Sequence, residues 1–299
     1  MNVLEIRSLE KSFGDKHVLC GLDMSVPEGG VFGFVGRNGA GKTTTMKAVL
    51  GLLKPDGGEI LVSGEGVAFG QTPTNRHVGY LPDVPEFYSF MTPREYLRLC
   101  GECMKMADDK ISSRSEELLE LVGLASEKHR IRGFSRGMKQ RLGVAQALLG
   151  SPKLLICDEP TSALDPIGRR EILDVLISVK DRTTVLFSTH ILSDVESICT
   201  DVALLDGGRI AMQGKVSELK RAGLRKEFSA EMLDAVSAEK LLDAFPDAVR
   251  ADRVTVVFSG GEDRIFEIIS FIGGNKLPLR KIERAETSLE SLFAEVVNK

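Results

Sequence analysis

The fold of this chain of 299 residues is decided by the stretch Val31-Phe-Gly-Phe-Val-Gly36-Arg-Asn-Gly-Ala-Gly41-Lys42-Thr43. Its first five residues form a short run that reads as a strand buried on both faces of a sheet. Gly36 to Thr43 then fit the pattern G-x-x-x-x-G-K-[ST], and the residues from about Lys42 to Leu52 favour a helix. The pattern thus lies between a strand and a helix, which is the structural context in which it binds phosphate.

The loop contains the residue types that a bound triphosphate requires. Glycines allow backbone N–H groups to close around phosphate oxygens, and the start of the helix adds the positive end of its dipole. Lys42 can reach the β- and γ-phosphates, and the Thr43 hydroxyl suits the octahedral oxygen shell of magnesium. We therefore expect ATP and Mg²⁺ as cofactors, bound through Gly36, Arg37, Asn38, Gly39, Ala40, Gly41, Lys42, Thr43 and Thr44.

Two adjacent carboxylates follow another apolar run. Leu154-Leu-Ile-Cys157 leads directly into Asp158 and Glu159 at the end of a predicted strand. One carboxylate can hold magnesium, and the other can orient or deprotonate an attacking water. Asp-Glu-Pro is only a helix-capping turn in many proteins, so it is the preceding phosphate loop that favours a catalytic pair here.

These motifs, in this order, resemble the nucleotide-binding subunits of ATP-binding cassette (ABC) transporters over roughly residues 1 to 220. The resemblance implies that Glu159 is the catalytic base, that Asp158 is on the magnesium, and that His190, in Phe187-Ser-Thr-His, contacts the γ-phosphate. A single histidine at a strand end is otherwise usually structural. Asp165, in Ser-Ala-Leu-Asp, looks like part of the D-loop that crosses the dimer interface of the family.

The adenine contact is less specific. Phe13, in Lys11-Ser-Phe-Gly, matches the aromatic position that stacks on adenine in the family, where tyrosine is commoner. A core aromatic is the alternative interpretation, and both stay open.

Two positions depart from the family pattern. The signature L-S-G-G-Q appears as Phe134-Ser-Arg-Gly-Met138, in which Ser135 and Gly137 can still meet a phosphate held by a second cassette, while Arg136 either adds charge there or faces solvent. Asp83 stands where glutamine is usual, as a magnesium ligand or as a plain turn residue after Pro82. Together with a C-terminal extension, these features look like cassette subunits of ABC-2 type exporters.

The expected fold is α/β: a P-loop NTPase cassette of the ABC type, with a mostly parallel core sheet, an antiparallel β subdomain and a helical subdomain. We assign the cassette to residues 1–222, with the helical subdomain at about 84–150. Residues 223–299 change to a strand–helix–strand–helix pattern, which predicts a small C-terminal α+β domain. A dimerisation or regulatory surface and a stabilising appendage are equally compatible with that domain.

Composition excludes several classes of protein. A net charge of −4, with basic and acidic residues interspersed, is unsuited to a nucleic-acid partner. No run approaches the ~18 apolar residues of a spanning helix, and the first residues lack a signal-peptide pattern, so we expect no direct membrane insertion. We expect a cytoplasmic protein that is peripheral on the inner face of the cell membrane.

The sequence therefore predicts the ATP-hydrolysing subunit of a transporter, an exporter by resemblance, that pairs with a second cassette, as a homodimer, and with a separate membrane permease. The resemblance places the permease contact at about Val84 to Lys105. Two alternatives remain: a non-transport ABC ATPase, and a regulatory subunit that hydrolyses ATP weakly. The sequence has neither a long coiled-coil insertion nor a second phosphate loop, which disfavours the first.

Overall fold

The computed structural model describes residues 1–70, 73–222, 227–284 and 289–297. Contacts divide the chain into two compact units, Met1–Val216 and Ser217–Asn298. Each unit has its own sheet and its own apolar core.

A six-stranded sheet in the order β10-β9-β3-β8-β7-β6 forms the centre of the first unit. β9, β3, β8, β7 and β6 are parallel, and β10 is antiparallel to β9. The three strands β3, β7 and β8 are buried at every position, as apolar runs covered on both faces must be. The six strands are β3 Val31–Gly36, β6 Val78–Leu81, β7 Leu154–Asp158, β8 Thr184–Thr189, β9 Asp201–Asp206 and β10 Arg209–Lys215.

A second sheet, in the order β2-β1-β4-β5, is antiparallel. Its strands are β1 Asn2–Phe13, β2 Lys16–Pro27, β4 Gly57–Val62 and β5 Glu65–Gly66. The order of strand, glycine-rich loop, helix and strand in the sequence predicts that the strand after α1 joins β3 in one α/β unit. Instead β4 pairs with β1, because only alternate residues such as Ile60 and Val62 are buried and such a strand suits a half-buried sheet.

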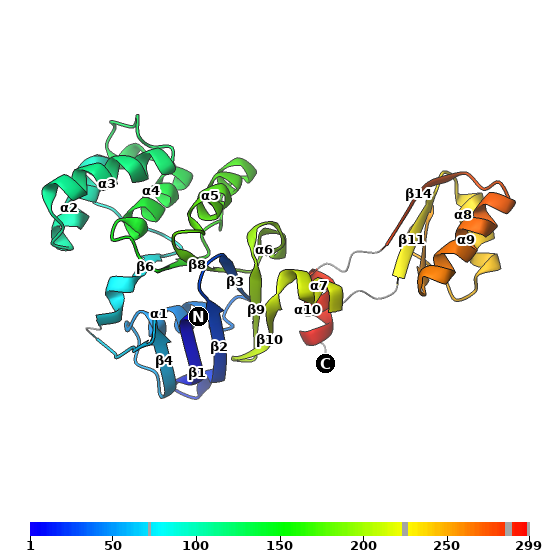
Figure 1. Ribbon diagram of the computed structural model, residues 1–299, viewed down its shortest axis with the longest axis horizontal. Coiled ribbons are helices and arrows are strands. Elements are labelled where there is room, and N and C mark those ends of the chain that lie inside the picture. The colour runs from blue at the N-terminus through cyan, green and yellow to red at the C-terminus, as the bar shows by residue number, and fades with distance from the viewer. Residues whose placement is uncertain (71–72, 223–226, 285–288, 298–299) are drawn as a thin grey trace. The chain divides into compact units, whose positions relative to one another are not determined.

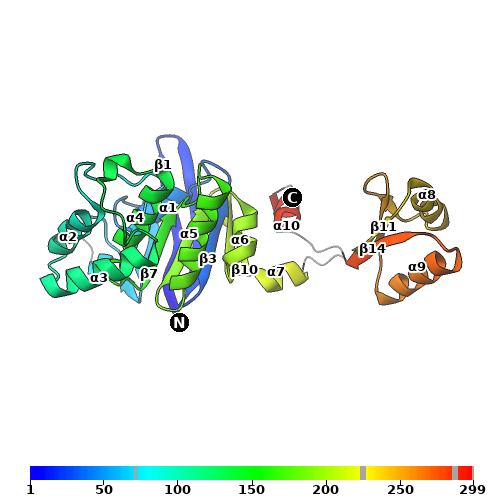
Figure 2. The same cartoon turned by 90° about the horizontal axis from the view of Figure 1, so that it is seen from above.

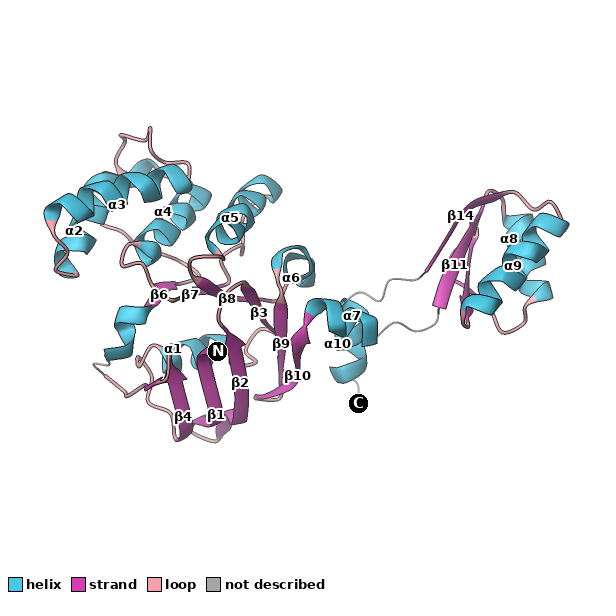
Figure 3. Cartoon of the chain, in the orientation of Figure 1, coloured by secondary structure: helices cyan, strands magenta, loops and turns pink. Residues whose placement is uncertain are grey.

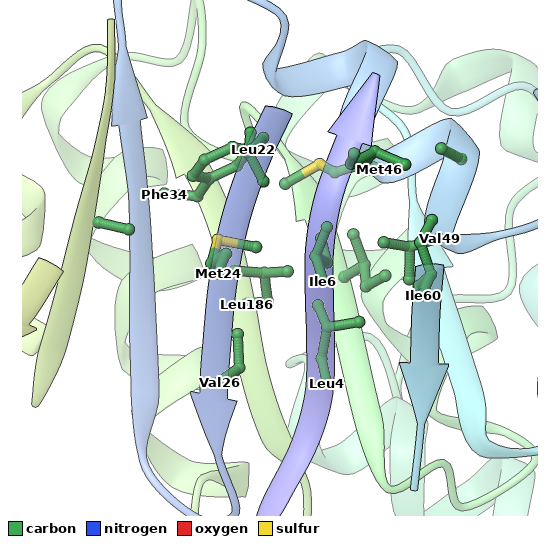
Figure 4. Packing of buried hydrophobic residues seen from close by; sticks show 14 of the residues in the cluster. Leu4, Ile6, Leu22, Met24, Val26, Phe34, Met46, Val49, Ile60 and Leu186 are labelled. Carbon is green, nitrogen blue, oxygen red and sulfur yellow. The ribbon is translucent and has the colours of Figure 1, made fainter. Parts of the chain in front are cut away.

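Helix α1, Lys42–Val49, lies between the two sheets. Met46 and Val49 pack against Leu4 and Ile6 of β1 on one side, in the same core cluster as Phe34 and Leu186 of the parallel sheet (Figure 4). Burying each of these two helix side chains contributes roughly 1.5–3 kcal/mol. This packing fixes the start of α1 at the end of β3.

Helices cover the other face of the parallel sheet and extend to one side of it (Figures 1 and 2). They are α2 Pro93–Cys103, α3 Asp108–Leu121, α4 Arg136–Leu148, α5 Pro166–Val179 and α6 Leu192–Ile198, with short 3₁₀ helices η1 Pro73–His77 and η2 Ile131–Gly133. Thr92 closes a capping box with Glu95 at the start of α2, and the Ser135 hydroxyl accepts a hydrogen bond from the Met138 amide at the start of α4.

The second unit has a four-stranded antiparallel sheet in the order β12-β13-β11-β14, with α8 and α9 on one face (Figure 3). Phe228 of β11 and Phe258 of β13 stack at 5.4 Å between ring centroids, and Leu241 of α8 and Ile268 of α9 close the core over them. The elements are α7 Val216–Ala222, β11 Glu227–Met232, α8 Ala235–Ala244, β12 Val249–Arg250, β13 Thr255–Ser259, α9 Glu262–Gly274, β14 Leu279–Arg284 and α10 Leu289–Val297. The sequence pattern predicts that the last helix starts at Ser288, which is outside the described residues.

The expected α/β architecture is confirmed: a mostly parallel core sheet, an antiparallel sheet, a helical segment and a small C-terminal α+β unit. No helix in the described part of the chain combines the length and the apolar composition needed to span a membrane.

Candidate functional site

The loop between β3 and α1 has a backbone that only glycine adopts easily. Gly39 and Gly41 have φ angles of 80° and 114°. A Cβ on Gly36 would lie 2.8 Å from the Leu205 carbonyl oxygen, and one on Gly41 would lie 2.8 Å from Leu19 Cδ2. The chain can therefore turn here tightly enough to surround an anion with main-chain groups.

The start of α1 leaves its positive end available. Gly41 is the N-cap and provides no side-chain hydrogen bond, and the first turn contains no acidic residue. The first amides of a helix lack partners within the helix, so an anion placed there is stabilised by N–H groups and by the dipole.

Lys42 points back into the loop. Its ammonium donates to the carbonyl oxygens of Gly36 and Arg37, at 2.6 and 3.4 Å, and lies 3.2 Å from Glu159 Oε1. The side chain is only 7% exposed. A buried ammonium held by carbonyls and one carboxylate is positioned to exchange the carboxylate for phosphate oxygens.

Strand pairing brings the two carboxylates and the histidine to the same edge. β7 and β8 are parallel neighbours with Asp158 in register with Ser188, so Glu159 and His190 both follow adjacent strand ends. Asp158 accepts hydrogen bonds from the Thr43 hydroxyl and from the Ser188 hydroxyl, each at 2.7 Å. Asp158 is thereby fixed beside the first turn of α1.

Ser188 is a residue that the sequence analysis did not select. It is fully buried, donates to Asp158, and its Oγ accepts a hydrogen bond from the Glu159 amide at 3.0 Å. One hydroxyl thus sets the position of both carboxylate residues. A serine directly after the apolar run Val185–Phe187, two residues before His190, was the available signal.

Glu159 has a strained backbone. Its φ is 48°, in the left-handed region that costs a non-glycine residue about 1 kcal/mol or more. Its carboxylate is largely buried, with Oε1 toward Lys42 and Oε2 2.9 Å from His190 Nδ1. The strain accompanies a conformation that holds the carboxylate between an ammonium and an imidazole.

These groups surround a cavity of about 400 Å³. It is lined by Asn38, Gly39, Gly41, Lys42, Thr43, Thr44, Asp83, Glu159, Ser162 and His190. Asp83 comes from the loop after β6, and its pKa lies above the usual value, first because of burial and then because of the nearby charges of Asp158 and Glu159, whereas Arg136 acts to lower it. The lining of the cavity therefore combines one buried cation, Lys42, with two carboxylates, Asp83 and Glu159.

Other residues selected from the sequence are placed elsewhere. Ser135, Gly137 and Asp165 line a different cavity, of about 500 Å³, between the starts of α4 and α5. Phe13 is half exposed, with the Lys11 ammonium 5.4 Å from its ring centroid, and is not part of the core. Arg37 and Ala40 close a turn within the loop through an amide-to-carbonyl hydrogen bond of 3.1 Å.

The donor set fits magnesium only in combination with phosphate. Within the described residues, no group of three or more His, Cys, Asp or Glu side chains could hold a metal ion. Thr43 and Asp158 offer two oxygens 2.7 Å apart, and magnesium prefers an octahedral shell completed by phosphate oxygens and water. The residues present fit a phosphate-bound magnesium ion rather than a free one.

Comparison with known proteins identifies similar proteins of one family. Residues 19–162 match the family model described as ABC transporter. The chain is 37% identical to the uncharacterized ABC transporter ATP-binding protein YxlF of Bacillus subtilis, over 99% of this chain and all of that protein. It is 35% identical to the bacitracin transport ATP-binding protein BcrA of Bacillus licheniformis, over 99% of this chain and 97% of that protein.

A similar solved structure also comes from an ABC transporter. One similar structure is cbiO1 from Clostridium perfringens, described as part of the ABC transporter complex cbiONQ. The two share 27% identity and a TM-score of 0.67 over 82% of this chain and 96% of that one.

Proposed function

Since the chain belongs to the ABC transporter family, as an ATP-binding subunit, we propose that it hydrolyses ATP with magnesium to drive export by a separate membrane permease. The observation that carries this proposal is the single cavity shared by Lys42, Thr43, Glu159 and His190.

In this proposal the triphosphate lies on the loop amides and the start of α1, and Lys42 neutralises the β- and γ-phosphates. Thr43 and Asp158 hold the magnesium, with Asp83 near it. When bound, magnesium neutralises charge that develops on the phosphate oxygens.

Hydrolysis requires a water aligned with the γ-phosphorus. Glu159 orients this water and accepts its proton as oxygen bonds to phosphorus and the bond to the β–γ bridging oxygen breaks, giving ADP and phosphate. The 2.9 Å contact between His190 Nδ1 and Glu159 Oε2 supports a shared task, in which His190 positions the carboxylate and contacts the γ-phosphate.

A second cassette completes the site in this proposal. Ser135, Gly137 and Asp165 line a cavity other than that of Lys42, so they are available to a nucleotide held by another copy. Ser135 caps α4, whose first turn contains no acidic residue and suits a phosphate. We propose a homodimer in which ATP lies between the two copies.

We place the permease contact on the surface between β6 and α3. Val84, Tyr88, Phe90 and Met104 are each more than half exposed there. The rings of Tyr88 and Phe90 are 5.9 Å apart between centroids. Exposed apolar side chains that lie together mark interaction surfaces, and members of this family act with membrane permeases. The proposed direction of transport is export. This assignment follows from the acidic Asp83 and from the Ser-Arg-Gly-Met form of the signature.

Calorimetry with ATP and magnesium tests the binding step. We expect Lys42→Ala to weaken ATP binding at least ~100-fold, because several charge-assisted hydrogen bonds are lost. Lys47→Ala is the matched control, since Lys47 is exposed on the same helix and should leave binding unchanged. Equal affinity of the wild type and Lys42→Ala would contradict the site, and absence of phosphate release by the wild type with its permease would contradict hydrolysis.

A further inference from the structure

The two departures from the family pattern contact each other. Arg136 Nη2 lies 3.6 Å from Asp83 Oδ1, although the two residues are far apart in the chain. Each side chain is about half exposed. Each had been interpreted separately, and the structure makes them one ion pair.

A second contact holds the same loop. Gln140, buried one turn further along α4, donates from Nε2 to the Asp83 carbonyl oxygen at 3.3 Å. Asp83 is thus held by its main chain and by its carboxylate, both times from the first turns of α4. A displacement of the start of α4 would be transmitted to Asp83.

The pair connects two cavities. Asp83 lines the cavity that contains Lys42, and Arg136 lines the cavity that contains Ser135 and Gly137. Both residues also line a third cavity of about 420 Å³ between them. A charge that arrives on the Ser135 side therefore acts on the same guanidinium that balances Asp83.

The ion pair is weak enough for Arg136 to exchange Asp83 for another anion. At 3.6 Å its atoms are beyond hydrogen-bond distance, and half-exposed ion pairs change an equilibrium only about two- to fivefold. A phosphate offers several oxygens to the planar guanidinium and forms shorter, paired hydrogen bonds. Arg136 is also the first residue of α4, and the positive end of the helix dipole there further favours a bound anion.

We propose that Asp83 and Arg136 form a charge-exchange link between the two nucleotide sites of the dimer. Phosphate of the partner's ATP, arriving at Ser135 and Gly137, takes Arg136 away from Asp83. The released carboxylate is then free to serve as an oxygen ligand for the magnesium of its own site, which favours binding of the magnesium–ATP complex there. Occupation of either site thereby favours occupation of the other, since such coupling is reciprocal.

This inference rests on the proposed function, and its test separates the two. The rate of phosphate release is measured against ATP concentration for the full-length wild type with its permease, and for Arg136→Ala, Asp83→Asn and the double variant. If the wild type does not hydrolyse ATP, the proposed function fails. If the wild type does hydrolyse ATP, the link is judged from three quantities: the ATP concentration at half-saturation, the maximal rate and the Hill coefficient.

We expect Arg136→Ala to lower the Hill coefficient toward one and to shift the ATP concentration at half-saturation about two- to fivefold. In the Asp83→Asn background the same change should lower the Hill coefficient no further, because the link is already broken, although the ATP concentration at half-saturation still rises as the hydrogen bonds from Arg136 to phosphate are lost. Arg136→Lys keeps the charge and should retain most of the cooperativity. Lys139→Ala, which removes a positive charge one turn further along α4 from the same third cavity, should leave the Hill coefficient unchanged.

An equal loss in the Hill coefficient on Arg136→Ala in the two backgrounds would overturn the link, as would an equal loss of cooperativity in Lys139→Ala. Thermal unfolding of each variant identifies loss of folded protein, and Arg136→Lys provides the comparison if Arg136→Ala is unstable.

Discussion

Replacement of Glu159 by Gln separates ATP binding from hydrolysis. The change keeps the size and most hydrogen-bonding capacity of the side chain but removes its negative charge and its basicity. We expect phosphate release to fall by about 10²- to 10⁴-fold, the usual contribution of a general base. The same variant should bind ATP more tightly than the wild type.

The gain in affinity follows from the position of the carboxylate. Glu159 Oε1 is 3.2 Å from the ammonium that would neutralise the phosphates, and its side chain is only 15% exposed. Two unit charges about 5 Å apart, at an effective dielectric constant of about 20–40, repel by roughly 2–3 kcal/mol. Part of this repulsion is offset by Lys42, so we expect tightening by about 1–2 kcal/mol, or about 5- to 30-fold.

Two assays are needed. Calorimetry with ATP and magnesium gives the affinity, and phosphate release under saturating ATP gives the rate. Asp181→Asn is the control, because it removes one carboxylate from an exposed position outside the cavity. Wild-type turnover by Glu159→Gln would refute the assignment of the base, and weaker binding would refute the electrostatic argument.

Three further outcomes are expected. Thr43→Ala should raise the magnesium concentration required for half-maximal phosphate release by about tenfold, because one oxygen ligand is lost; an unchanged magnesium titration would contradict this. Phe90→Asp should abolish co-purification with the permease while ATP affinity is retained, whereas Phe69→Asp, equally exposed but outside the proposed contact surface, should leave co-purification intact; the reverse result would place the contact elsewhere. Leu186→Ala should lower the free energy of unfolding by about 2–5 kcal/mol in urea, and Leu52→Ala, which is 61% exposed, by less than about 0.5 kcal/mol; similar losses would mean that the core cluster is wrongly identified.

Local patterns in the sequence predicted most of the fold. The apolar runs of β3, β7 and β8 and the glycine loop depend on neighbouring residues, so they could be located without the structure. β6 was not identified, because four residues that include Gly79 carry little strand signal.

Features that depend on pairing across the chain could not be predicted in this way. The partner of β4 is decided by burial against α1, which no local pattern contains. In the site, Lys42, Asp158 and Glu159 were found from motifs, but the bridging role of Ser188 and the contact between Asp83 and Arg136 depend on tertiary geometry. A polar residue at the end of an apolar run was visible in the sequence, but its hydrogen-bond partners were not.

The left-handed backbone of Glu159 has an evolutionary consequence. Glycine or asparagine adopts that conformation with less cost, so replacement of Glu159 by either residue would make the polypeptide somewhat more stable while removing the carboxylate proposed as the base. A duplicated gene released from selection for turnover would therefore drift readily at this position. Retention of glutamate in a lineage would then indicate that the proposed ATP hydrolysis is still under selection.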